Sequence, residues 1–207
     1  MSDALSVTDR LFHTTLDPDA ALRRLREATA GCEDGELFLE HRESEAVSLG
    51  DGRIRAASYD QSRGFGLRAV SGEAAGYAHA GEITEDALAR AAATVRAVAQ
   101  GRSGTLDVGP RATNARLYDD ANPLLAMGFA EKTALLMEMD AHARALDSRV
   151  VQVSASLTGE WQAVRILRPD GQAVADIRPL VRFNVSVVVE QDGRRETGSF
   201  GTGGRHG

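Results

Sequence analysis

The side chains best suited to metal chemistry in this sequence are its histidines, and their spacing does not form a zinc site. The five are His13, His41, His79, His142 and His206. A helical zinc pair needs two histidines three to five residues apart, so that both imidazoles project from one face of the helix. No two histidines here have that spacing, and isolated histidines are more often structural or surface residues. The sequence therefore predicts no helical zinc pair in this chain.

The sequence also lacks the common motifs for nucleophilic catalysis and phosphate binding. It contains neither a G-x-S-x-G elbow nor a G-x-x-x-x-G-K-[ST] loop. The glycine-rich stretch 198–205 resembles a phosphate cradle, but no helix follows it and the preceding strand has no βαβ context. We interpret the stretch as a flexible or tightly turned segment. The alternative is a loop in which Gly203 and Gly204, followed by Arg205, let the backbone approach a ligand closely.

Two arginines near the end of the chain are the strongest candidates for binding a carboxylate. The apolar residues of stretch 181–189 occupy its odd positions, which leaves Arg182, Asn184 and Ser186 on a polar face. Arg178 is spaced to share that face with Arg182, and two guanidinium groups can hold a carboxylate. The alternative is a surface ion pair of little energetic consequence. The candidate substrate-approach or interface residues are Arg178, Arg182, Gly203, Gly204 and Arg205.

The composition excludes several classes of function. The chain has 207 residues, a net charge of −6 and a single lysine, Lys132, so we expect no nucleic-acid partner. Cys32 is the only cysteine, which excludes an intrachain disulfide. The N-terminus lacks a signal-peptide pattern, and no apolar run approaches the roughly 20 residues of a membrane span. We therefore expect a cytoplasmic protein without a membrane partner.

Capping residues and turn signals predict a helix, a sheet and a second helix in the first half of the chain. Asp17 is placed to cap a helix over residues 18–31, and Thr84 is placed to cap one that ends at Gly101. A turn at 50–52 joins two strands. Helices on one face of an antiparallel sheet give an α+β domain, which we place at residues 1–110. The predicted strands are 36–42, 44–49, 53–59, 64–70 and 75–80.

The second half is predicted to form a β-rich α+β domain over residues 121–207, incomplete at its C-terminus. An extended connector covers 101–120. A helix over 130–146 follows, with Leu135, Leu136, Met139, Ala143 and Leu146 facing inward. Strict alternation over 151–158 predicts a strand, 168–171 reads as a turn, and Asp192-Gly193 predicts a hairpin into a strand over 194–199.

Several separated motifs resemble one known family. The stretch 64–80, GFGLRAVSGEAAGYAHA, resembles the GxGxRxxxGxxxGxA signature of the TldD/PmbA family of zinc metallopeptidases, also called the modulator of DNA gyrase family. The stretches 151–159 and 176–196 and the glycine-rich end are similar to the TldD branch. The resemblance runs in order from about Leu5 to Arg205. The signature positions are Gly64, Gly66, Arg68, Gly72, Gly76 and Ala78.

This resemblance implies a zinc metallopeptidase that cleaves extended or unfolded peptides together with a PmbA/TldE-like subunit. Family members carry an HExxxH motif in a later C-terminal domain, where two histidines bind zinc and the glutamate acts as general base. The sequence has no such motif. The resemblance therefore assigns no catalytic residue and no metal-binding residue to this chain. We expect the C-terminal metallopeptidase domain to be absent and this chain to be inactive alone, with zinc bound only in the full-length protein.

Three interpretations follow from these observations. The first is a scaffold segment of a TldD-like peptidase, whose polar face and edge strands pair with an extended peptide by strand addition. The second is a complete, non-catalytic module that binds a peptide, a PmbA/TldE-like subunit or a second copy of itself. The third is a truncated product with an exposed sheet edge. An HExxxH motif further along the same reading frame separates the first interpretation from the others.

Overall fold

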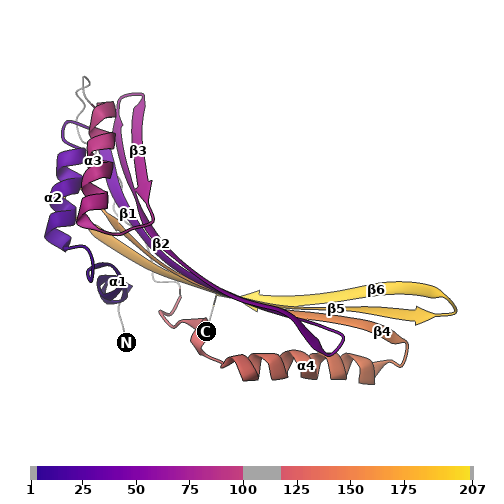
Figure 1. The fold of residues 1–207 in the computed structure, drawn as a ribbon. Helices are drawn as coiled ribbons and strands as arrows, with labels where there is room; N and C mark the ends of the chain where they lie inside the picture. Colours follow the sequence, from indigo (N-terminus) through magenta and orange to yellow (C-terminus); the bar gives the residue numbers. More distant parts are fainter. Residues whose placement is uncertain (1–3, 100–117, 206–207) are drawn as a thin grey trace. The chain divides into compact units, whose positions relative to one another are not determined.

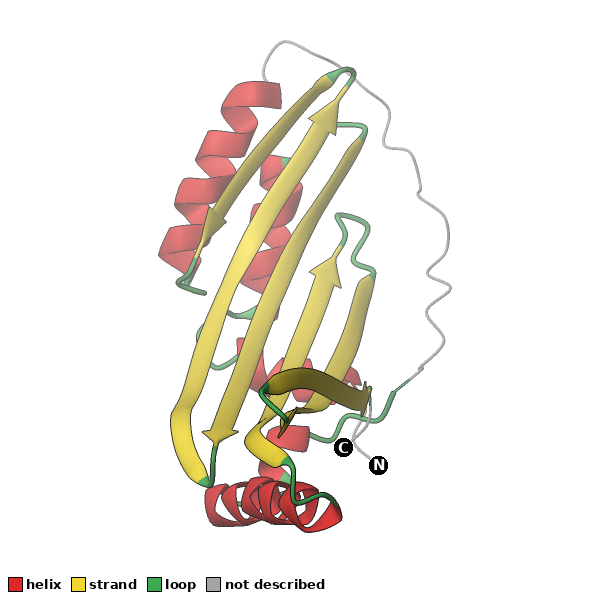
Figure 2. Cartoon of the chain, turned by 90° about the vertical axis from the view of Figure 1, so that its right-hand side faces the viewer, coloured by secondary structure: helices red, strands yellow, loops and turns green. Residues whose placement is uncertain are grey.

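The computed structural model describes residues 4–99 and 118–205, which form an α+β fold around one six-stranded antiparallel sheet (Figures 1 and 2). The predicted fold class is therefore confirmed. The strand order is β3-β2-β1-β4-β5-β6. The helices are α1 (Ala4–Phe12), α2 (Pro18–Ala28), α3 (Glu85–Ala99), the 3-10 helix η1 (Pro123–Leu125) and α4 (Phe129–Leu146). The strands are β1 (Asp34–Gly50), β2 (Arg53–Ser71), β3 (Ala74–Ala80), β4 (Val150–Leu167), β5 (Ala173–Gln191) and β6 (Arg194–Gly204).

The chain divides into two compact units, and β1, β2, β4 and β5 each contribute residues to both. Unit 1 consists of Met1–Arg42, Ser62–Asp120 and Gln162–Ile177, and unit 2 of Glu43–Gln61, Ala121–Trp161 and Arg178–Gly207. The domains at 1–110 and 121–207 remain predictions.

Unit 1 is a helix-covered sheet, in which α2 and α3 lie side by side and α3 packs on β3 (Figure 1). The predicted caps are confirmed: Asp17 Oδ1 accepts a hydrogen bond from Ala20 N at 2.8 Å, and Thr84 Oγ1 accepts one from Ala87 N at 3.2 Å. Helix α1 was not predicted, although it buries Val7 and Phe12. The predicted helix end at Gly101 and most of the connector 101–120 lie outside the described residues.

The strands are longer than predicted. The predicted strands 36–42 and 44–49 form one strand of 17 residues, and 53–59 and 64–70 form one of 19 residues. The prediction of five short strands was wrong, because a change in the apolar pattern along a strand does not interrupt its backbone pairing. Residues 60–63 contain no glycine or proline, so nothing in the backbone interrupts β2 there.

Two Asp-Gly turns close hairpins as predicted. Asp51 and Gly52 have φ values of 50° and 69°, and Asp192 and Gly193 have 53° and 78°. Positive φ at both central residues defines the type I′ turn, whose twist matches that of paired strands. These turns set the β1–β2 and β5–β6 registers.

The glycine-rich stretch is a strand, so its interpretation as a flexible or tightly turned segment was wrong. Strand β6 pairs with β5 from Gln191↔Arg194 to Val181↔Gly204. The glycines allow this pairing: a Cβ on Gly203 would lie 2.3 Å from Val181 O, and one on Gly201 would lie 2.7 Å from Asn184 Oδ1. Glycine here permits a close approach of two strands.

In unit 2, α4 covers one face of the sheet with a stripe that is partly charged. Leu136 is fully buried against a core that contains Val47, Leu49 and Ala155. Lys132 and Asp140, one helical turn to either side, are also buried, whereas Leu146 is 74% exposed. The prediction that Leu146 faces inward was therefore wrong. Residues four apart share a helix face, and the sequence pattern did not reveal that charged residues occupy this one.

Lys132 is buried because both of its partners lie beside it. Its Nζ donates to Glu45 Oε2 on β1 at 2.7 Å and to the Leu124 carbonyl of η1 at 2.7 Å. The two side chains of the ion pair are 8% and 17% exposed. A buried charge is tolerated only when it is paired and hydrogen-bonded, so this contact holds α4, β1 and η1 in one arrangement.

Replacing Lys132 by alanine should destabilise unit 2 by about 3 kcal/mol, because it leaves the half-buried carboxylate of Glu45 without its ion-pair partner. Urea unfolding, together with amide hydrogen exchange in β1 and α4, measures the effect. Arg194→Ala is the control: its ion pair with Glu196 is 82% and 62% exposed, and we expect a loss below about 1 kcal/mol. The double variant K132M/E45L should recover most of the loss. Equal effects of K132A and R194A would contradict this role.

Gly203→Ala should lower the free energy of unfolding by about 1–3 kcal/mol, because the new Cβ overlaps the carbonyl oxygen of Val181. The pairing should loosen where the end of β6 meets β5. Faster amide exchange in β5 and a lower melting temperature are the expected results. The matched control on the same strand is Gly198→Ala, whose Cβ would meet Val187 Cγ2 at an ordinary 3.8 Å. An unchanged melting temperature in G203A would show that the close approach is not limiting.

Candidate functional site

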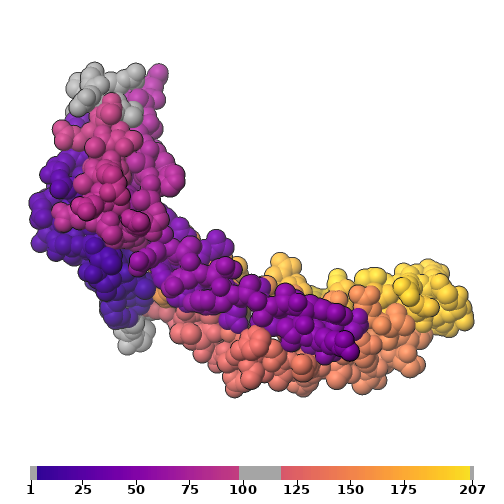
Figure 3. All heavy atoms as spheres, in the orientation of Figure 1, coloured from indigo at the N-terminus to yellow at the C-terminus, as the bar shows by residue number. Residues whose placement is uncertain are grey.

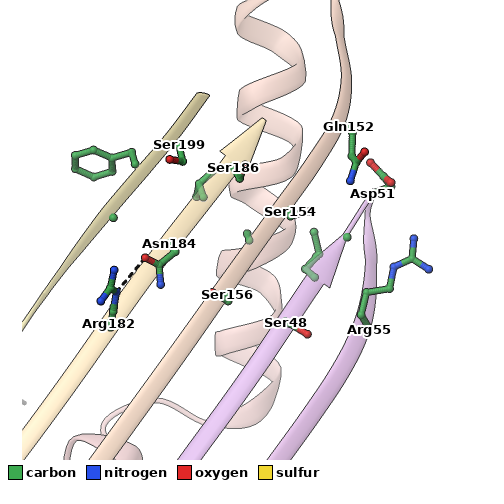
Figure 4. A pocket seen from close by; sticks show the side chains of 16 residues that line it. Ser48, Asp51, Arg55, Gln152, Ser154, Ser156, Arg182, Asn184, Ser186 and Ser199 are labelled. Carbon is green, nitrogen blue, oxygen red and sulfur yellow. Dashed lines mark hydrogen bonds between the residues drawn. The ribbon is translucent and has the colours of Figure 1, made fainter. Parts of the chain in front are cut away.

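Unit 2 has a polar depression of about 610 Å³, called the hollow below, on the face of the sheet away from α4 (Figure 4). Five strands, β1, β2, β4, β5 and β6, contribute to it. Hydroxyl and amide groups dominate its side chains, and its charged residues are Asp51, Arg55 and Arg182. The uncharged polar residues are Ser48, Gln152, Ser154, Ser156, Asn184, Ser186 and Ser199.

The hollow is polar because side chains alternate between the two faces of each strand. On β5, Arg182 and Asn184 line the hollow, while Phe183 and Val185 pack toward Leu136 on the opposite face. The predicted polar face of β5 is confirmed by this arrangement. Ser154 on β4 faces the hollow in the same way, with the buried Ala155 on the side of α4.

The side chain of Arg182 is oriented by Asn184, two residues further along β5, and Asn184 has room for this contact because the residue opposite it on β6 is a glycine. Its Nε donates to Asn184 Oδ1 at 3.1 Å (Figure 4). Asn184 in turn lies over Gly201, where a Cβ would come within 2.7 Å of Oδ1. Among the described residues, no carboxylate pairs with Arg182, and its terminal guanidinium nitrogens have no hydrogen-bond partner. The group is therefore available to bind an anionic ligand.

At the other rim, the carboxylate of Asp51 is already engaged. Its Oδ1 accepts from Val153 N at 3.1 Å and from Arg144 Nη2 at 2.8 Å. The hydrogen bond from Val153 and the nearby guanidinium of Arg144 lower the pKa of Asp51 below its usual value of 3.8. Arg55 lies over Gly50, where an added Cβ would come 2.9 Å from the Nε of Arg55. The positive charge of Arg55 also favours the ionised form of Asp51.

The structure brings one of the predicted site residues into the hollow. Arg182 lines it, whereas Arg178 lies earlier on β5 and does not. Gly203 and Gly204 end β6, opposite Arg182 and Val181, and Arg205 follows the strand. The functional roles of these residues remain predictions. Sequence reasoning missed Arg55 and the serines of β1 and β4, although alternation along those stretches was a usable signal.

Strand β6 is an edge strand of the described sheet and is exposed along almost all of its length (Figure 3). In a two-residue hairpin the pair that flanks the turn, here Gln191↔Arg194, is hydrogen-bonded, and the pairs then alternate. Every second residue of β6 therefore directs its N–H and C=O away from β5. These residues are Arg195, Thr197, Ser199, Gly201 and Gly203. Their side-chain positions lie on the same face of the sheet as Arg182, and Ser199 and Gly201 line the hollow.

The described residues do not fit a zinc site. In residues 4–99 and 118–205, no group of three or more His, Cys, Asp and Glu side chains is arranged to hold a metal ion. His13 contacts Asp9 at 3.2 Å, and His79 lies against the ring of Tyr77 with 5.7 Å between centroids. His41 is buried on β1. Within the same residues, no helix is long and apolar enough to cross a membrane.

Comparison with protein families identifies both parts of the chain. Residues 35–99 match the family described as PmbA/TldA metallopeptidase domain 1, and residues 122–207 match the PmbA/TldA metallopeptidase central domain. The chain is 43% identical over 176 residues to the metalloprotease TldD homolog of Haemophilus influenzae, covering 83% of this chain and 36% of that protein. It is 38% identical over 173 residues to the homolog of Buchnera aphidicola from Schizaphis graminum, with coverage of 83% and 36%. The matched chain thus spans little more than a third of these relatives.

Solved structures share the fold at low sequence identity. A protein from Bacteroides thetaiotaomicron described as a modulator of DNA gyrase superimposes with a TM-score of 0.68 at 12% identity, covering 91% of this chain and 45% of that one. TldE from Thermococcus kodakarensis superimposes with a TM-score of 0.67 at 14% identity, covering 90% and 42%. These similarities show a common architecture.

The hydrogen bonds of Asp51 predict a stability that depends on pH. Because its folded-state pKa is depressed, Asp51 stabilises the fold above its unfolded pKa, and this contribution is lost as the pH falls through the folded value. Asp51→Asn should therefore lower the melting temperature at pH 7 and have little effect well below pH 3.8. Asp192→Asn, at the same position of the other Asp-Gly turn, is the control. A D51N deficit that is equal at pH 7 and at low pH would contradict an ionic role.

Proposed function

Because this chain belongs to the PmbA/TldD metallopeptidase family, we propose that it is the scaffold and peptide-binding portion of a zinc metallopeptidase that cleaves extended or unfolded peptides. The observation that carries the proposal is the match of two family domains in their order along the chain. The 43% identity to a relative named a metalloprotease supports it. The exposed edge strand β6 and the polar hollow beside it support binding and positioning of the peptide as the role proposed for this chain.

Strand addition at β6 is the proposed mode of peptide binding. The outward N–H and C=O groups of β6 can form main-chain hydrogen bonds with any extended peptide, which suits a peptidase that accepts unfolded chains. A peptide added there would direct every second side chain over the hollow face, beside Ser199 and the two small residues Gly201 and Gly203. Pairing therefore supplies affinity, and the hollow supplies selectivity.

The proposed assembly is a pair with a PmbA/TldE-like subunit or a second copy of this chain, in the cytoplasm. The family assignment supports such a partner. Zinc belongs to this proposal at the level of the whole protein, where it would activate a water molecule for hydrolysis of the peptide bond.

The proposal is tested by reading the gene past the Gly207 codon and assaying the longer protein. We expect an in-frame HExxxH motif, and hydrolysis of unfolded casein that a chelator abolishes and added zinc restores. A histidine-to-alanine change in that motif, with the fold retained, should remove the activity. A stop codon at this point, or casein hydrolysis that survives chelation, would overturn the zinc peptidase proposal. The stop codon would instead favour a non-catalytic module that binds a peptide or a partner subunit.

A further inference from the structure

We propose that Arg182 is a specificity-determining residue that selects an acidic side chain in a peptide paired with β6. The inference rests on the proposed strand addition and names the class of peptide that this edge prefers. Four features of the structure support it: the register of β6, the absence of side chains at Gly201 and Gly203, the free guanidinium nitrogens of Arg182, and the charge balance of the hollow.

The register places Arg182 directly behind a gap in the edge strand. Arg182 on β5 is opposite Gly203 on β6, and Asn184 is opposite Gly201. Opposite residues of paired strands project from the same face, so any side chain on these two glycines would stand between Arg182 and the edge. Since both positions are glycine, neither places a side chain between Arg182 and the edge of the sheet.

The distance across this gap fits an arginine–carboxylate contact. A peptide added to β6 lies two strand spacings from β5, or about 10 Å. An arginine side chain and a glutamate side chain that extend toward each other can span this separation. Side chains shorter than arginine on β5, such as Ser186, cannot reach the added strand. Arg182 is therefore placed to contact the peptide residue that pairs beside Gly203.

The charge balance favours an acidic residue at that position. Asp51 is the only carboxylate among the described residues that line the hollow. It already accepts hydrogen bonds from Val153 and Arg144, and Arg55 lies beside it. Arg182 is exposed, has no carboxylate partner among the described residues, and is oriented through its Nε by Asn184. A positive charge kept in this way, in a chain of net charge −6, fits a carboxylate that arrives with the ligand.

The experiment measures peptide binding to the 207-residue chain by fluorescence anisotropy at low ionic strength. The probes are labelled ten-residue peptides of Thr, Ser and Val with one central Glu or one central Gln. We expect the Glu peptide to bind about three- to fivefold more tightly, as for an exposed ion pair, with a preference that declines as salt is added. Arg182→Gln should equalise the two peptides, Arg182→Lys should keep a preference for Glu, and Arg182→Glu should favour a peptide with central Lys.

Arg194→Gln is the matched control, because Arg194 is an exposed arginine on β6 that pairs with Gln191, so its side chain lies on the face of the sheet opposite Arg182 and does not line the hollow. A Glu preference that persists in R182Q, or that R194Q removes equally, would overturn the inference. Equal binding of both peptides by the unmodified chain would also overturn it while leaving strand addition intact.

A third probe separates this inference from the binding mode on which it rests. N-methylation of alternate peptide residues removes the N–H groups that strand pairing needs, so one of the two alternate methylation patterns should weaken binding about tenfold or more and the other should be tolerated. Insensitivity to both patterns, or no binding of any probe, would overturn strand addition and the inference together. The zinc-dependent hydrolysis of the longer protein is measured independently of either result.

Discussion

Alternation of side chains along paired strands is the constraint on which unit 2 depends. On β5, neighbouring residues belong to different environments: Phe183 packs toward the α4 core, and Arg182 and Asn184 line the polar hollow. A shift of one residue in the register would exchange the two faces and bury the arginine. The two Asp-Gly turns oppose such a shift because each sets the pairing of its hairpin at the tip.

Charged contacts fix the position of α4 on the sheet more closely than hydrophobic packing alone would. The α4 helix turns Lys132 and Asp140 toward the sheet, and the contact of Lys132 with Glu45 and the Leu124 carbonyl ties the helix to β1 and η1. Arg144 connects Asp140 to Asp51 at the tip of the β1–β2 hairpin. Buried or half-buried pairs of this kind add little net stability, but a misplaced helix would leave their charges without partners.

The family membership and the geometry address different parts of the function. The family supplies the peptidase chemistry as a proposal for the whole protein, and the matched part of this chain spans 36% of the length of the two TldD homologs. The chain's own geometry supplies an exposed strand edge next to a hollow of about 610 Å³ that is rich in hydroxyl groups. In the proposed strand addition, main-chain pairing accepts many peptide sequences, and Arg182 behind Gly201 and Gly203 biases the choice among them.

The sequence by itself determined the family, the α+β class, the helix caps at Asp17 and Thr84, and both Asp-Gly turns, because each of these depends on residues close together in the chain. Local patterns also separated the two faces of β5. Only the tertiary structure decided which strands are continuous, that the glycine-rich stretch is the edge strand β6, and that Lys132 is buried. These features depend on partners far away in sequence, since a glycine run becomes a strand when a neighbouring strand pairs with it, and a lysine can be buried when a glutamate from another element meets its charge.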